Sequence, residues 1–227
     1  MIDPSPVRAV LLDLDGTLLD TAPEIAAAAA EMLAELGLDP VPAPTVRDFI
    51  GKGIPSLVRR TLVASLGREP DERRTGSAIE SFFFNYEKQI GRAANPYPGV
   101  VDGLDSMRAA GLGLACVTNK TARFTLPLLE ATGLANYFGA VISGDSVARK
   151  KPAADPLLAA CNLLGVAPQE AVMVGDSAND ALAARAAGCP VLLVPYGYSE
   201  GVGVQSIDCD GIVASLLHVA GLLRTRS

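Results

Sequence analysis

The chain has 227 residues, of which 49% are hydrophobic, and a formal net charge of −6. This length suffices for one sizeable domain, or for a core with a smaller inserted unit. The acidic balance and the lack of a long run of Lys or Arg argue against a nucleic-acid partner, and no run approaches the roughly 18 apolar residues that a membrane span needs.

The first apolar run covers residues 7–12 and ends at Asp13. It is short and continuous, as is typical of a strand buried on both faces of a sheet. The segment TAPE (21–24) has the pattern of a capping box, which predicts the start of a helix. The chain that follows shows only helical patterns, and the clearest further helices are expected at 54–66 and 80–90.

The segment NPYPG (95–99) marks a change, because prolines and glycines interrupt helices and favour turns. Beyond it, short apolar runs alternate with helical patterns, which predicts a parallel sheet with helices on both faces. We therefore expect an α/β fold: a doubly wound, Rossmann-like parallel-sheet core (1–20 and 95–227) with an inserted helical unit at 21–94. Asp155, followed by a proline, predicts the N-cap of one core helix. The predicted core strands are 113–117, 140–142, 171–174 and 191–194, and the predicted core helices are 121–132, 155–164 and 178–187.

Four polar segments follow the predicted strands or lie in the loops beyond them. They are DLDGT (13–17), Thr118-Asn119, Lys151-Pro152 and GDSAND (175–180). In open α/β sheets, ligands bind at the edge where the strands have their carboxyl ends. We therefore expect the four segments to share one site.

The residue types in these segments fit phosphate chemistry. Several carboxylates together form an oxygen-rich site of the kind that Mg²⁺ prefers. A hydroxyl at Thr118, amides at a helix start and the charge of Lys151 are suited to holding a phosphate. A carboxylate can also accept a phosphoryl group and lose it again to water, which divides one difficult step into two.

These segments resemble the haloacid dehalogenase superfamily. The resemblance rests on DLDGTLLDTAPE (13–24), VTNK (117–120), KP (151–152) and VGDSANDALAARAAGCP (174–190), which occur in the order typical of that family. Three further segments, GKGIPSLVRR (51–60), NPYPGV (95–100) and PYGYSEG (195–201), look like those of bacterial phosphoglycolate phosphatases. The resemblance implies a magnesium-dependent enzyme that cleaves a small phosphate monoester, with 2-phosphoglycolate as the expected substrate, and a helical cap at 21–94.

The resemblance also implies roles for four acidic residues. Asp13 would be the nucleophile and a ligand of Mg²⁺. Asp15 would be the general acid and base, with its backbone carbonyl on the metal. Asp176 would ligate the metal, and Asp180 would orient the ligands around it.

Five further residues are expected at the bound substrate. By the same resemblance, Thr118 and the amide of Asn119 would hold the transferring phosphoryl group, and Lys151, rather than its neighbour Lys150, would stabilise Asp13 and the phosphate. Gly16 permits a sharp turn beside the phosphate. Lys52, between two glycines, has two interpretations: it meets a carboxylate of the substrate, or it is a solvated loop charge.

Other functions remain open at this point. The substrate could instead be a sugar phosphate, a nucleotide or pyrophosphate, or the chain could be a phosphomutase. A non-catalytic phosphate-binding protein is also conceivable, although such proteins usually lack the first or second aspartate. Asp15 argues against a dehalogenase, because those relatives lack an acid there. We assign no catalytic role to His218, and we expect a monomer or a homodimer.

The cysteines and the N-terminal residues indicate the cellular compartment of the protein. The four cysteines show no CxxC spacing and lie in or near apolar runs, which is typical of reduced thiols. Residues 1–8 contain an acid and two prolines and do not resemble a signal peptide. We therefore expect a cytoplasmic protein.

Overall fold

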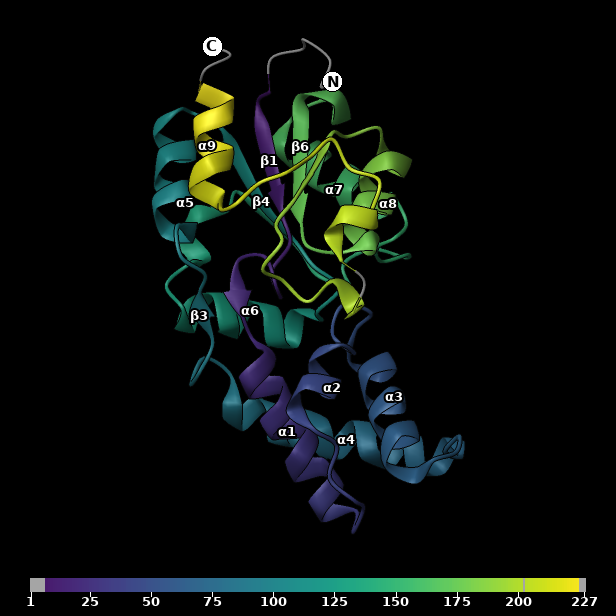
Figure 1. Ribbon diagram of the computed structural model, residues 1–227. Coiled ribbons are helices and arrows are strands. Elements are labelled where there is room, and N and C mark those ends of the chain that lie inside the picture. Colours follow the sequence, from purple (N-terminus) through teal and green to yellow (C-terminus); the bar gives the residue numbers. More distant parts are fainter. Residues whose placement is uncertain (1–6, 202, 225–227) are drawn as a thin grey trace.

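The computed structural model describes residues 7–201 and 203–224 and contains a parallel sheet between two layers of helices (Figure 1). The strand order is β5-β4-β1-β6-β7-β8, and each neighbouring pair is parallel. The α/β class predicted from the alternation of strands and helices is therefore confirmed. The strands are β1 (Ala9–Leu12), β4 (Gly113–Val117), β5 (Ala140–Ile142), β6 (Ala171–Gly175), β7 (Val191–Leu193) and β8 (Gly211–Ile212).

The central strand β1 is buried on both faces, which explains its continuous apolar sequence. Val10 and Leu12 face a core that includes helices α5, α6 and α9, whereas Ala9 and Leu11 face helices α7 and α8. Figure 1 shows α5 and α9 on one side of the sheet and α7 and α8 on the other. These helices are α5 (Val100–Ala109), α6 (Ala122–Ala131), α7 (Asp155–Leu164), α8 (Ala178–Ala187) and α9 (Leu216–Arg224).

The chain between β1 and α5 forms a separate group of helices, which lies below the sheet in Figure 1. Its hydrophobic core includes Met32 and Leu33 of one helix and Phe82 and Tyr86 of another. Burying one large apolar side chain stabilises a fold by about 1.5–3 kcal/mol, so this cluster holds the helices together. The helices are α1 (Ala22–Glu35), α2 (Ala43–Arg47), α3 (Ile54–Leu66) and α4 (Glu72–Gln89).

The two segments of chain that connect the sheet to these helices lie side by side. The short strands β2 (Leu19–Asp20) and β3 (Asn95–Pro96) pair antiparallel. Glu24, at the start of α1, strengthens this junction, because its Oε1 accepts hydrogen bonds from the amides of Ala93 (2.7 Å) and Ala94 (2.9 Å). Both ends of the helical group are thereby fixed at one place.

The predicted capping of two helices was wrong. Helix α1 begins where expected, but Thr21 makes no side-chain cap; its hydroxyl donates to Asp15 instead, and Glu24 reaches the second connecting segment. The N-cap of α7 is Ala154 rather than Asp155, whose carboxylate pairs with Arg149 at 2.9 Å. In each case the polar side chain pairs with a residue outside the first turn of the helix instead of capping it.

The helices within the described ranges are all too short or too polar to cross a bilayer.

Candidate active site

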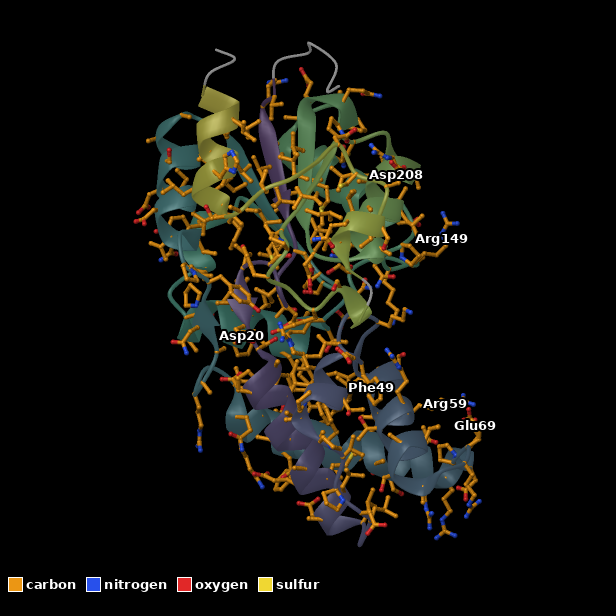
Figure 2. The ribbon with its side chains drawn as sticks, viewed as in Figure 1. Asp20, Phe49, Arg59, Glu69, Arg149 and Asp208 are labelled. Carbon is orange, nitrogen blue, oxygen red and sulfur yellow. The ribbon has the colours of Figure 1, made fainter. Side chains whose placement is uncertain are left out.

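The polar segments predicted to meet do line one cavity at the carboxyl ends of β1, β4 and β6. The sheet side supplies charged and polar groups, and the helical group supplies apolar side chains and backbone. Figure 2 places Asp20 at the junction between the sheet and the helical group, whereas Arg59 and Glu69 lie at the outer edge of the helical group. The residues predicted from sequence that line the cavity are Asp13, Asp15, Thr118, Asn119, Lys151, Asp176 and Asp180.

The buried ammonium group of Lys151 lies between two carboxylates. Its Nζ donates to Oδ1 of Asp13 at 2.7 Å, to Oδ1 of Asp180 at 2.6 Å and to the carbonyl of Val117 at 2.7 Å. Burial alone would lower the pKa of Lys151, but the two carboxylates raise it above its ordinary value, so the lysine stays charged. The neighbouring Lys150 is exposed and donates to the carbonyl of Lys52.

Asp176 and Asp180 are fixed by hydrogen bonds from the loops around them. Asp176 accepts from the Thr17 hydroxyl (3.2 Å) and from the amide of Tyr198 (2.7 Å). Asp180 Oδ2 accepts from the amide (3.1 Å) and the hydroxyl (2.7 Å) of Ser177, which forms the capping box of α8. Asp180 thus caps a helix with one oxygen and pairs with the buried lysine through the other.

Three carboxylates gather closely enough to hold a metal ion. Oxygens of Asp13, Asp176 and Asp180 all lie within 4.8 Å of one another, and the charge of Lys151 bonds to two of these three carboxylates. Burial, and then the nearby Asp180, raises the pKa of Asp176 to about 7, and burial likewise raises the pKa of Asp13. A set of acidic oxygens crowded in this way fits a hard divalent cation.

Asp15 lies outside that cluster and has different partners. Its Oδ1 accepts a hydrogen bond from the Thr21 hydroxyl (2.6 Å) and lies 3.0 Å from Nζ of Lys120. Lys120 in turn donates to the hydroxyl of Tyr86 at 2.8 Å. Burial raises the pKa of Tyr86 to about 12, so the phenol is neutral at physiological pH.

The loop after β4 connects the sheet to the helical group. Thr118 follows the strand directly, and its hydroxyl oxygen accepts the amide of Lys120 at 3.2 Å. The side chain of Asn119 donates to the carbonyl of Gly51 and to the carbonyl of Lys151, both at 2.9 Å. The family resemblance indicates a role for the backbone amide of Asn119, and its side chain in addition bridges the two parts of the molecule.

Gly16 has a conformation that a side chain would disturb. Its φ is +90°, and a Cβ atom there would collide with the carboxylate of Asp176. Its amide donates to the carbonyl of Leu19 at 2.9 Å. The glycine therefore lets the loop after β1 approach Asp176 closely, while contact with a phosphate stays a prediction.

Lys52 is exposed at the rim, and its contact with a substrate also stays a prediction. The backbone on either side of it, at Gly51 and Gly53, does line the cavity. Of the described residues in 21–94, those lining the cavity carry apolar side chains or none: Ile25, Ile50, Gly51, Gly53, Ile54 and Leu57.

Comparison with known proteins identifies the family. Residues 10–194 match the model of the family described as haloacid dehalogenase-like hydrolase. The chain belongs to this family. It is 50% identical to the phosphoglycolate phosphatase of Nitrosospira multiformis over 99% of both chains. It is 48% identical to the plasmid-encoded phosphoglycolate phosphatase of Cupriavidus necator, over 96% of this chain and 94% of that one.

Solved structures agree with this assignment. A predicted phosphoglycolate phosphatase from Haemophilus somnus superposes with a TM-score of 0.91 at 28% identity, covering 96% of this chain and 98% of that one. CbbY from Rhodobacter sphaeroides, crystallised with phosphate, gives a TM-score of 0.79 at 25% identity, over 94% and 96% of the two chains. The chain is therefore a haloacid dehalogenase-like hydrolase of the phosphatase class, as its motifs predicted.

Sequence reasoning missed three residues of this hydrolase site. Lys120 pairs with Asp15, and Tyr86 holds Lys120, as described above. Tyr198 accepts the amides of Thr21 (2.7 Å) and Ala22 (2.9 Å) at its hydroxyl while its own amide holds Asp176. The VTNK and PYGYSEG segments contained Lys120 and Tyr198, so the signal was present, but nothing local indicated their partners.

Proposed function

We propose that the chain is a Mg²⁺-dependent phosphatase that hydrolyses 2-phosphoglycolate to glycolate and phosphate, with Asp13 as the nucleophile. The observation that carries this proposal is the Asp13 carboxylate at the end of β1, held by Lys151 at 2.7 Å and lining the cavity. The relatives support this substrate, because proteins 48–50% identical over nearly the whole chain are named phosphoglycolate phosphatases.

The acidic cluster would hold the metal through Asp13 and Asp176, with Asp180 beside them and the backbone carbonyl of Asp15 as a further ligand. When bound, Mg²⁺ supplies positive charge that offsets the repulsion between a carboxylate nucleophile and an anionic phosphate. Lys151 contributes a second positive charge and keeps the carboxylate of Asp13 fixed.

The chemistry then takes two steps. In the first, an oxygen of Asp13 attacks phosphorus and the bond to the glycolate oxygen breaks, while Asp15 gives that oxygen a proton. Thr118 and the amide of Asn119 would hold the phosphoryl oxygens. In the second, Asp15 takes a proton from water, the water oxygen attacks phosphorus, and the aspartyl-phosphate on Asp13 breaks to release phosphate.

Residues 21–94 would act as a cap domain over a core formed by 1–20 and 95–227. Ile25, Ile50, Ile54 and Leu57 cover the polar groups of the sheet edge with apolar side chains. Such a cover limits the entry of water and strengthens electrostatic interactions below it. We expect the enzyme to act in the cytoplasm, as a monomer or a homodimer.

The direct test is phosphate release from a panel of monoesters, in Mg²⁺ and in EDTA. Preferred release from 2-phosphoglycolate that disappears in EDTA is the expected result. Metal-dependent release with a preference for a sugar phosphate, a nucleotide or pyrophosphate would keep the mechanism and reject the substrate. An isomerised product without free phosphate would identify a phosphomutase, and no reaction at all would favour a binding protein.

A further inference from the structure

Lys120 is a buried cation that the chemistry proposed above does not use. It is 5% exposed and follows Thr118 and Asn119 in the loop after β4. A charge buried in this way is costly unless it is paired and hydrogen-bonded, so its partners indicate its purpose. Those partners are the carboxylate of Asp15 and the hydroxyl of Tyr86.

Tyr86 is a rigid anchor for this lysine. Its ring is fully buried in α4 and packs against Phe82 (5.6 Å between centroids) and Phe124 (5.1 Å). Nζ of Lys120 lies 4.8 Å from the centre of the same ring, so the ammonium meets both the hydroxyl and the aromatic face. The position of α4 therefore fixes the ammonium group.

The contacts of Asp15 are all on one of its oxygens. Lys120 and the Thr21 hydroxyl both lie against Oδ1, and within residues 7–201 and 203–224 no group donates to Oδ2. An ammonium group can only donate, so the oxygen beside it stays an acceptor. Both neighbours therefore occupy Oδ1, and Oδ2 is the oxygen of Asp15 that can turn toward a leaving group.

We propose that Lys120 is a positioning residue for Asp15, anchored on α4 by Tyr86, which directs the proton of Asp15 onto Oδ2 for transfer to the leaving group. The inference rests on the proposed role of Asp15 as general acid. Lys120 itself neither gains nor loses a proton. The acid is then oriented jointly by a loop of the core and a helix of the cap.

The test compares two substrates of similar size whose leaving groups differ. Glycolate leaves 2-phosphoglycolate as an alkoxide that needs a proton, whereas acetate leaves acetyl phosphate without one. The parameter is kcat/KM, which covers the steps up to departure of the leaving group. Lys120→Met should lower kcat/KM for 2-phosphoglycolate by about 10- to 100-fold, part of the 10²–10⁴ that acid catalysis contributes, and for acetyl phosphate by about 3-fold or less.

Asp15→Asn separates this inference from the function on which it rests. If Asp15→Asn shows no selective loss on 2-phosphoglycolate, the acid role itself fails. If Asp15→Asn shows that loss, the double variant Asp15→Asn/Lys120→Met should have almost the same kcat/KM for 2-phosphoglycolate as Asp15→Asn alone, because Lys120 acts only through Asp15. A full additional loss in the double variant, or equal losses on both substrates in a folded Lys120→Met protein, would overturn the inference.

Two further variants keep the test decisive. Tyr86→Phe removes one hydroxyl and leaves the ring packing, and it should show the same selectivity with a smaller loss, about 3- to 10-fold. If Lys120→Met does not fold, Tyr86→Phe decides alone, and the lack of a selective loss there refutes the inference. Lys88→Met is the matched control, because it removes an exposed lysine from α4, the helix that carries Tyr86. It should leave kcat/KM for both substrates unchanged.

Discussion

Replacing Lys151 by Met should destabilise the metal-free protein strongly. The lysine is 2% exposed and donates to two carboxylates and a carbonyl, so its loss leaves buried acids without their cation. Breaking a buried ion pair on one side costs about 3–5 kcal/mol, which for a chain of this size lowers Tm by about 6–20 °C. Urea unfolding followed by circular dichroism in EDTA measures the free energy of unfolding directly.

Lys150→Met is the matched control for this measurement. The two lysines are adjacent, but Lys150 is exposed and makes one hydrogen bond to the carbonyl of Lys52. Its replacement should cost about 1 kcal/mol or less. If Lys151→Met lowers the free energy of unfolding no more than Lys150→Met does, the buried pair is not the stabilising element that the geometry indicates.

Three further predictions concern the site. Asp13→Asn should abolish turnover without altering the circular dichroism spectrum; transfer of labelled phosphate from substrate to this variant would contradict the nucleophile assignment. Gly16→Ala should lower the free energy of unfolding by about 1–3 kcal/mol, because of its positive φ and the collision with a carboxylate, and an unchanged urea midpoint would disprove this. Lys52→Ala should raise KM for 2-phosphoglycolate more than for p-nitrophenyl phosphate; equal increases would make it a solvated loop charge.

The convergence of the site was predictable because parallel strands align their carboxyl ends. Asp13, Thr118 and Asp176 each follow a short apolar run, and those runs are the three adjacent strands β4, β1 and β6. Strand positions alone thus placed these groups at one sheet edge. The stretch at 21–94 shows helical periodicity only, and helices α1 to α4 lie there, although the sequence did not predict α2 and placed the start of α4 at 80 rather than 72.

The partners of the site residues could not be predicted, because they depend on which side chains meet across the chain. Tyr86 lies on a helix of the insert, 34 positions from Lys120, and no spacing rule connects them. At Thr21 and Glu24 a local pattern suggested a capping box, but Asp15 and two distant amides supplied the actual partners. Strands β2 and β3, with two residues each, are too short to show any periodicity.

The pairing of β2 with β3 bears on how such an enzyme could gain or lose its helices. Asp20 and Asn95 are partners in an antiparallel ladder, so the helical group leaves the core and returns to it at neighbouring points. Antiparallel strands can be joined by a turn of about two residues. A deletion that joined β2 directly to β3 through such a turn would leave the register of the six-stranded sheet unchanged. In topology, the helical group is therefore one long insertion in the loop of a β-hairpin.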